Sequence, residues 1–344
     1  MKKMNKFFAA AVMLAVAVSA TAAAKPKAST ADSSKLKIVT TIFPEYDWTK
    51  QILGDKAKDA DLTLLLDNGV DLHSYQPTVQ DIAKISNADI FIYVGGESDE
   101  WVKDVLRSAQ NKHLVSVNLL EVLGDRVKAE EVVEGMEAEH HHDEEEHHHH
   151  HDGEEHHHDD DDEEEEEMDE HVWLSLRNAQ FICNAICETL CAKDSANAAA
   201  YRANCAAYTK KLADLDAAYS TMTAAAKRRT VLFGDRFPFR YLTDDYGLTY
   251  YAAFTGCSAE SEASFKTIAF LSQKMDELDL QHVMQIESGK GKIARTIIQN
   301  SKNKKAKILT IDSMQSTTAR DIKKGATYLS IMQKNLEVLK TALN

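Results

Sequence analysis

Proline and glycine are scarce in this sequence of 344 residues, which contains only 4 prolines and 13 glycines, while 44% of its residues are hydrophobic. This composition excludes a collagen-like protein, a coiled-coil rod and disorder along the whole chain. No basic patch with interleaved aromatic residues occurs, so nucleic acid is not an expected partner. The length allows two domains of ordinary size.

Basic residues are absent from one long stretch. Residues 131–170 contain 22 acidic residues and no Lys or Arg, although the whole chain has a formal net charge of only −15. The other 304 residues therefore carry +7, or about +4 without the three lysines of residues 1–24. The sequence predicts a nearly neutral body with one very acidic insert.

The N-terminus resembles an export signal. Residues 1–24 begin with three lysines, continue with an apolar run at 7–18 and end in small residues that suit cleavage. The apolar run is short for a transmembrane helix, so a retained membrane anchor is the weaker alternative. The segment lacks the cysteine of a lipoprotein, so we expect a periplasmic protein whose residues 25–35 form a flexible leader.

No pair of the five cysteines has Cys-x-x-Cys spacing. Cys183, Cys187 and Cys191 recur at every fourth position and share one face of a predicted helix. A metal site on that face is one interpretation, but small buried helix residues are the more typical one. Cys205 or Cys257 can pair with a distant partner in an oxidising compartment, and the sequence does not fix the connectivity.

Short β-rich runs alternate with helical stretches on both sides of the insert. Strands are predicted at 36–43, 60–66, 88–94, 114–119, 230–233, 249–254, 282–286 and 307–311. Helices are predicted at 44–53, 78–87, 98–109, 238–246, 264–278, 290–300 and 319–343. Thr78 is the expected N-cap of the second, with Asp81 at its third position. Continuous apolar strands between helices indicate parallel sheets covered on both faces. The predicted fold is α/β, with two lobes that each contain a roughly four-stranded parallel sheet flanked by helices.

A stretch without Gly or Pro, residues 177–227, predicts two helices with a break near residue 194. The second is about 30 residues, or roughly 45 Å, long. It defines a rigid linker helix at 194–228, between an N-terminal lobe at 36–193, which includes the insert, and a C-terminal lobe at 229–344. Ligands of open parallel sheets bind beyond the carboxyl ends of the strands, so the cleft between the lobes is the expected site.

Histidine is concentrated in the insert, which holds eleven of the fifteen. They are His140, His141, His142, His147, His148, His149, His150, His151, His156, His157 and His158. Imidazole suits zinc, copper and nickel, and the segment has too few apolar residues to form a core. We expect a disordered accessory collector that binds metal weakly and in a pH-dependent way, with a merely solvated acidic loop as the alternative.

Two histidines outside the insert lie in loops at the predicted carboxyl edge of the first sheet. His73 follows the second strand, and His171 comes directly after the insert and before a helix. Together they predict a metal site. His113 and His282 begin strands at the opposite edge, so we expect structural roles for them.

These segments resemble a known family. Residues 69–78, GVDLHSYQPT, are similar to Gly-x-Asp-Pro-His-x-Tyr-x-Pro-Thr, the first signature of the zinc- and manganese-binding receptors of ABC importers. Residues 169–176, DEHVWLSL, are similar to the second signature, and a His-rich acidic loop often separates the two in zinc members. YLTDDYGLTY, CSAESEAS and ILTIDSM resemble the C-terminal pattern, so the likeness covers about residues 36–343.

The resemblance implies a monomeric periplasmic receptor without enzymatic activity. It would capture Zn²⁺, or alternatively Mn²⁺, in the cleft and deliver it to the permease and ATPase of an ABC importer. His73 and His171 would be ligands from the first lobe. Asp312 matches the position of the family's acidic ligand after the last strand.

One position departs from the family pattern. Arg236 stands where the family has a His or Glu ligand, and a charged guanidinium has no lone pair to give to a metal. Arg236 can instead orient an acid such as Glu262 or Asp312. Asp235, Glu262 or water are candidates for the fourth ligand, and a salt bridge or a helix cap is the alternative role for both acids and for Glu287.

Two other functions remain open from the sequence. A secreted zinc hydrolase would use two His, one Asp and a bound water, but the chain lacks a His-Glu-x-x-His motif. A stand-alone metal buffer or adhesin would need no transporter.

Overall fold

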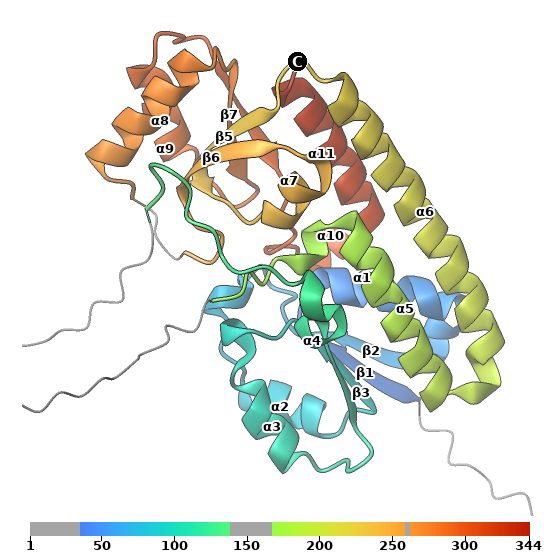
Figure 1. The fold of residues 1–344 in the computed structure, drawn as a ribbon. Helices are drawn as coiled ribbons and strands as arrows, with labels where there is room; N and C mark the ends of the chain where they lie inside the picture. Colours follow the sequence, from blue (N-terminus) through green and yellow to red (C-terminus); the bar gives the residue numbers. More distant parts are fainter. Residues whose placement is uncertain (1–34, 138–166, 259–261) are drawn as a thin grey trace, which may run out of the picture. The chain divides into compact units, whose positions relative to one another are not determined.

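The structure is a computed structural model that describes residues 35–137, 167–258 and 262–344 (Figure 1). The predicted signal at 1–24, the leader except residue 35 and all eleven insert histidines lie outside the described residues. No helix in the described part of the chain is long and apolar enough to span a membrane.

The N-terminal sheet is parallel throughout and has the order β2-β1-β3-β4. Its strands are β1 (Leu36–Thr40), β2 (Ala60–Leu64), β3 (Ile90–Tyr93) and β4 (Val115–Asn118). All four residues of the inner strand β3 are buried, as the continuous apolar run ADIFIYV predicts for a sheet covered on both faces. The four predicted strands are confirmed, each slightly shorter than expected.

The C-terminal sheet is also parallel and has the order β6-β5-β7-β8. Its strands are β5 (Thr230–Arg236), β6 (Thr249–Phe254), β7 (His282–Ile286) and β8 (Lys307–Ile311). The bounds of β6, β7 and β8 are those predicted. Strand β5 extends further than predicted, through an irregularity between Phe233 and Arg236, and this extension places Arg236 at the carboxyl end of the sheet.

Three of the four helices of the N-terminal half lie where the sequence predicts them. The four are α1 (Phe43–Leu53), α2 (Val79–Ser86), α3 (Val102–Ser108) and α4 (Leu119–Leu123), of which the short α4 was not predicted. Thr78 caps α2 as predicted: its hydroxyl accepts from the Asp81 backbone N–H, and the Asp81 carboxylate accepts from the Thr78 backbone N–H. The caps fix where each strand-to-helix loop ends, and these loops carry the site residues.

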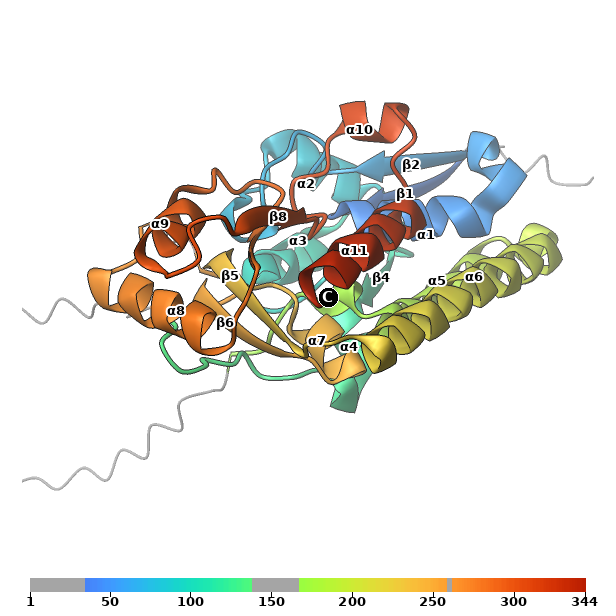
Figure 2. The same cartoon turned by 90° about the horizontal axis from the view of Figure 1, so that it is seen from above.

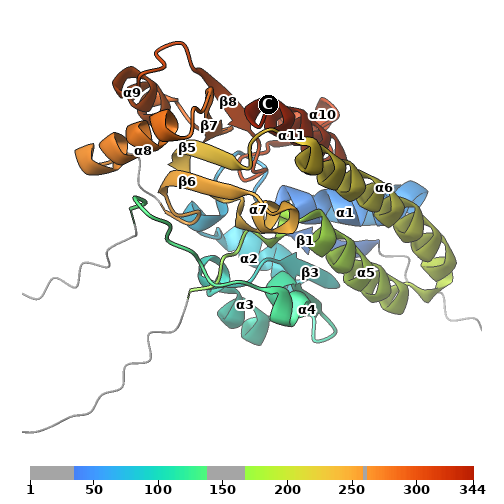
Figure 3. The ribbon, with the colours of Figure 1, turned by 45° about the horizontal axis from the view of Figure 1, so that its top comes forward.

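The predicted pair of long helices is present as α5 (Leu176–Lys193) and α6 (Ala198–Ala225), joined by a short turn at Ser195–Asn197. Helix α6 has 28 residues and contacts α1 of the N-terminal half and α11 (Tyr328–Ala342) of the C-terminal half (Figures 1 and 3). The buried Tyr219 hydroxyl donates to the Met332 carbonyl at 2.6 Å, which attaches α6 to α11. The long helix therefore packs against elements of both halves.

The remaining helices of the C-terminal half are α7 (Arg240–Tyr246), α8 (Phe265–Glu277), α9 (Lys292–Asn300) and α10 (Ala319–Lys323). Helices α8 and α9 lie side by side, as Figure 2 shows. The single helix predicted at 319–343 is divided into α10 and α11, because Gly325 adopts a φ of +96° that ends the first helix. The fold class is α/β, as predicted.

The described ends of the insert contact both halves. Glu130 donates its backbone N–H to the Glu167 carbonyl at 2.7 Å, so the two ends meet beside each other. From there the chain reaches β6, where Glu137 donates its N–H to the Ala253 carbonyl at 2.9 Å. The beginning of the insert thus lies along the C-terminal sheet rather than within the N-terminal lobe alone.

Candidate metal centre

His73 lies in the short turn Leu72–Ser74, in the loop that follows β2. The Asp71 carboxylate accepts from the His73 backbone N–H at 3.1 Å and holds this turn. The Nδ1 atom of His73 lies 2.8 Å from the Ser98 hydroxyl, and Glu170 Oε2 lies 3.4 Å from the same nitrogen. With Nδ1 engaged by Ser98, Nε2 is left to face His171.

His171 is fully buried and precedes the turn Val172–Leu174. Asp169 Oδ1 accepts from the His171 backbone N–H at 2.8 Å and lies 2.9 Å from Nδ1 of its ring. A carboxylate in this position fixes the tautomer of a metal-binding histidine and leaves Nε2 as the ligand atom. The Tyr241 hydroxyl donates to the Asp169 carbonyl at 2.8 Å, so the C-terminal half holds this segment in place.

The two histidines converge on one point. Their Nε2 atoms lie 3.1 Å apart. A tetrahedral zinc ion at about 2.0–2.1 Å from each nitrogen would hold the nitrogens roughly 3.3 Å apart. The two rings therefore need to move apart only slightly for a zinc ion to fit between their Nε2 atoms. The structure brings together the two histidines that the sequence singled out.

Cys257 is the third residue of this group, and the sequence did not identify it as a ligand. Its sulfur and one nitrogen of each histidine all lie within 4.8 Å of one another. Cys257 follows β6, at the same carboxyl edge where the other candidates were sought. Its position after a predicted strand, within CSAESEAS, was the signal available from the sequence.

Gln315 also reaches the histidines, and it too was not predicted. It is buried in the loop after β8, where its Nε2 lies 3.0 Å from His171 Nε2 and 3.3 Å from an Asp71 oxygen. Rotation of the amide by 180° would place its oxygen toward His171. The C-terminal half therefore closes the site with neutral groups, the Gln315 amide and the Cys257 thiol.

Asp312, the predicted acidic ligand, does not belong to this group in the structure. Its carboxylate accepts from the Met314 backbone N–H at 2.8 Å and lines a neighbouring pocket with Glu287 and Lys334. Burial, followed by the nearby Glu287, raises the pKa of Asp312 to about 6. Its role as a ligand stays a prediction.

The other candidate acids, Glu262, Asp235 and Glu287, make contacts with groups other than the two histidines. Glu262 is exposed and pairs with Lys292 at 2.7 Å, which is the salt-bridge alternative. Asp235 accepts from the backbone N–H groups of Arg236 and Ile286, at 3.0 and 3.3 Å. Glu287 accepts from the Ser313 backbone N–H at 2.7 Å. In this structure these three acids bind Lys292 or backbone N–H groups rather than face the histidines.

Arg236 pairs with an acid, but not with either of the acids that were expected. Its guanidinium forms an ion pair with Asp71, beside His73, and also lies 3.4 Å from the Ser258 carbonyl. The partner was missed because Asp71 and Arg236 are 165 residues apart and meet only when the lobes meet. The residue that replaces the family's ligand thus joins the two halves next to the site.

A pocket of about 290 Å³ reaches His73 and Cys257 and is strongly acidic. It is lined by His73, Glu97, Ser98, Glu130, Glu167, Met168, Glu170 and Cys257. Four carboxyl groups around one opening create a potential that concentrates cations there. Glu130 directly precedes the acidic insert and Glu167 lies near its end, so both ends of the insert reach this opening.

Burial sets the protonation of the groups behind this opening. It lowers the pKa of His73 well below the usual value, and the nearby His171 and Arg236 lower it further. It also raises the pKa of Glu170 and brings that of Asp99 to about 7. His73 therefore stays neutral, the form that binds metal, to a lower pH than an exposed histidine.

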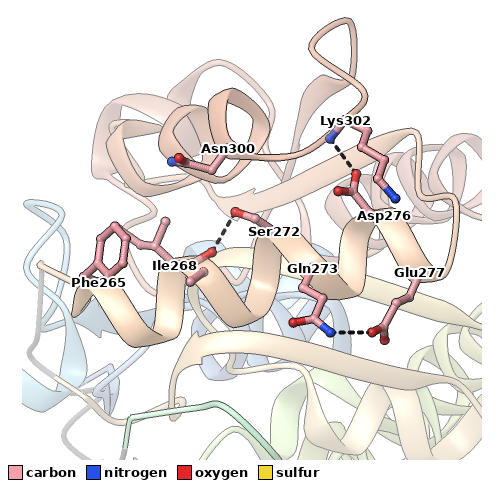
Figure 4. Close-up of a pocket in the computed structure, with 9 residues that line it drawn as sticks. Phe265, Ile268, Ser272, Gln273, Asp276, Glu277, Asn300 and Lys302 are labelled. Atoms are coloured by element: carbon pink, nitrogen blue, oxygen red, sulfur yellow. Dashed lines mark hydrogen bonds between the residues drawn. The ribbon is translucent and has the colours of Figure 1, made fainter.

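Two other features of the described residues lie apart from this centre. A hollow of about 520 Å³ separates α8 from the end of α9 and is lined by Phe265, Ile268, Ser272 and neighbours (Figure 4). Cys187, Glu188 and Cys191 form a second group with ligand atoms within 4.8 Å of one another. The helical cysteines are buried as predicted, and all five cysteines of the chain are free thiols.

Sequence comparison places the chain among zinc-uptake proteins. The family model described as "Zinc-uptake complex component A periplasmic" matches residues 38–342. The high-affinity zinc uptake system protein ZnuA of Bacillus subtilis is 33% identical over 337 residues, covering 98% of this chain and 96% of the relative. Zinc-binding protein AdcA of Streptococcus pyogenes is 29% identical over 318 residues, so the chain spans about half the length of the AdcA relatives, 56% in this case.

Solved structures give the same result. The metal-dependent lipoprotein YcdH of Bacillus subtilis has a TM-score of 0.69 and 29% identity, covering 90% of this chain and 99% of that one. The Zn(II)-bound ZnuA-like domain of Streptococcus pneumoniae AdcA has a TM-score of 0.66 and 28% identity, with the same coverage. With a family match from residue 38 to residue 342, this chain belongs to the family of periplasmic A components of zinc-uptake complexes.

Proposed function

We propose that this protein is an exported receptor that captures Zn²⁺ between its two lobes and delivers it to an ABC importer. The observation that carries the proposal is the convergence of the His73 and His171 Nε2 atoms, 3.1 Å apart, beside an acidic pocket that His73 lines. Neutral imidazole nitrogens suit zinc, and the hydrogen bond that the His171 ring donates to Asp169 is of the kind that supports zinc ligands.

His73 and His171 are the two nitrogen ligands of the proposed site. Asp312 remains the predicted carboxylate ligand, and it would have to leave its hydrogen bond with Met314 to reach the ion. We do not include Glu262 and Asp235 among the proposed ligands, since Glu262 pairs with Lys292 and Asp235 accepts from the Ile286 backbone N–H. Zinc is the cargo of the receptor, so binding must be tight but reversible.

The compartment and the partners follow from the family and from the N-terminal sequence. Residues 1–24 would direct export, and the mature protein would work in the periplasm. Its partners would be the permease of the importer and, through it, the ATPase. We expect a monomer with no catalytic turnover, since delivery needs only a site that closes around the ion and a surface that docks on the permease.

Zinc titration calorimetry of the mature chain tests the proposal. We expect one tight zinc site, which His73→Ala removes. His113→Ala serves as a control because His113 is exposed and does not belong to the site. Unchanged tight binding in His73→Ala would overturn the assignment.

Deletion of the gene in its host tests delivery. We expect growth to fail in zinc-depleted medium and to recover with added zinc. Normal growth would favour a metal buffer or adhesin, and zinc-dependent turnover of a substrate would favour a hydrolase.

A further inference from the structure

The loop after β6 brings a thiol to the two histidines. Gly256 packs directly on the His171 ring, because a Cβ at this position would lie 2.9 Å from the ring Cε1 atom. The next residue, Cys257, donates its backbone N–H to Glu130 Oε1 at 3.2 Å. These two contacts fix the backbone just before the Cys257 side chain, whose sulfur lies within 4.8 Å of one nitrogen of each histidine.

The separations suit a shared metal ion. The Cys257 sulfur and the two histidine nitrogens lie within 4.8 Å of one another. Around a tetrahedral zinc, a sulfur at about 2.3 Å and a nitrogen at about 2.0–2.1 Å lie roughly 3.6 Å apart. A change of side-chain rotamer covers such a difference, whereas Glu262 and Asp235 would each have to break their present contacts and move.

A bound zinc ion would itself favour an anionic ligand from the C-terminal half. Where the family has a His or Glu ligand, this chain has Arg236, whose cation is paired with Asp71. Burial and the nearby Glu130, Asp169 and Glu170 raise the pKa of the Cys257 thiol, so the thiolate forms only when the metal ion displaces its proton. A thiolate supplies one negative charge in direct contact with the ion.

We propose that Cys257 is the third metal ligand, as a thiolate, and that the resulting His₂Cys site selects Zn²⁺ over Mn²⁺. On binding, the sulfur forms a bond to the ion and its proton passes to solvent, with no oxidation or reduction. Thiolates suit zinc, whereas manganese prefers oxygen ligands. The fourth position is left for water or Asp312. The inference rests on the proposed function, because it names a ligand of the same site.

X-ray absorption of the full mature chain with one equivalent of zinc tests the ligand directly. We expect a sulfur scatterer at about 2.3 Å together with nitrogen scatterers at about 2.0–2.1 Å. This measurement needs no variant, so it stands even if a substitution disturbs folding. A spectrum with nitrogen and oxygen scatterers alone would overturn the proposal for Cys257 while leaving a histidine-based receptor intact.

Substitution separates this thiol from the other four. Cobalt in place of zinc gives a sulfur-to-metal charge-transfer band, which we expect in the parent chain and in Cys191→Ala but not in Cys257→Ser. Cys191→Ala is the control because Cys191 is a free thiol like Cys257 but belongs to the group on α5. A band that survives in Cys257→Ser and disappears in Cys191→Ala would place the metal on α5 and overturn the proposal.

Metal preference supplies the third measurement. We expect Cys257→Ser to lower zinc affinity by at least the roughly 10–100-fold that loss of a ligand's hydrogen-bonding partner costs. Cys257→Asp, which replaces sulfur by oxygen, should narrow the preference for zinc over manganese. An unchanged ratio of zinc to manganese affinity in both variants would refute the selectivity. If the parent chain bound no zinc at all, the proposed function itself would fail, which is a different result.

Discussion

His73 and His171 come from loops 98 residues apart, yet their Nε2 atoms lie 3.1 Å from each other. Each ring is oriented from behind, His73 by Ser98 and His171 by Asp169. The two Nε2 atoms face each other closely while both Nδ1 atoms are held by hydrogen bonds. This arrangement suits the binding of one metal ion between the two Nε2 atoms. The acidic insert separates them in the sequence, so the same segment that would gather metal also connects the two ligands.

The outer partner of His171 gives the first prediction. Asp169 Oδ1 accepts from both the backbone and the ring of His171, and an asparagine oxygen can keep both hydrogen bonds without the charge. We expect Asp169→Asn to lower zinc affinity by about 10-fold and Asp169→Ala by up to about 100-fold. Zinc competition with a fluorescent chelator measures both. Asp214→Asn, on the exposed face of α6, is the control. An equal loss of zinc affinity in that variant would show that the net charge of the protein, rather than the contact with His171, is responsible.

Most of the fold was predictable from the sequence because its signals are local. Apolar runs of four to eight residues gave the eight strands, and Thr78 with Asp81 gave the start of α2. The stretch without Gly or Pro gave α5 and α6. The break at Gly325 was missed because a single glycine within a helical pattern is ambiguous until its φ is known.

The site was only partly predictable, for a physical reason. His73 and His171 stand in loops at one edge of one sheet, so topology alone brings them together. Arg236 with Asp71, and Cys257 and Gln315 with His171, meet across the two lobes. These pairings depend on how the lobes pack, and no local pattern encodes that packing.

Asp99 gives a prediction about stability and pH. Burial is the main cause that raises its pKa from an ordinary 3.8 to about 7. Between pH 4 and 7 the unfolded chain has lost this proton while the folded chain keeps it, so stability decreases as pH rises. The decrease from this one group is at most about 1.4 kcal/mol per pH unit, and it ends above the folded pKa.

Substitution isolates that contribution. In Asp99→Asn the amide oxygen can still accept the Gly95 backbone N–H, which lies 3.0 Å from Asp99 Oδ2, but no proton is lost. We expect the variant to gain free energy of unfolding relative to the parent as pH rises from 5 to 8. Urea unfolding at four pH values measures the difference, and a constant difference would show that Asp99 does not titrate in this range.

The insert histidines give a prediction about stoichiometry. Replacing all eleven by Gln keeps the length and the acidic charge of the insert. We expect total zinc bound per chain to fall while the affinity of the tight site stays within about twofold, because the proposed ligands lie outside the replaced positions. Equilibrium dialysis gives the stoichiometry and chelator competition the affinity. Loss of the tight site would show that an insert histidine completes it.

Gly96 links backbone conformation to the site. Its φ of 78° and ψ of −163° belong to a region that is essentially restricted to glycine, and a Cβ there would lie 2.3 Å from Glu170 Oε1. Glu170 in turn accepts from the Ser98 backbone N–H at 2.9 Å, beside the ring of His73. We expect Gly96→Ala to destabilise the protein by about 2–3 kcal/mol and to weaken zinc binding as well.

Gly247 provides the matched control for that substitution. It ends α7 with φ 60° and ψ 41°, a left-handed conformation that costs an alanine about 1–2 kcal/mol, and nothing lies within 4 Å of a Cβ added there. Gly247→Ala should therefore lower the unfolding free energy modestly and leave zinc affinity unchanged. Equal losses of affinity in the two variants would mean that Gly96 acts through general stability rather than through Glu170 and Ser98.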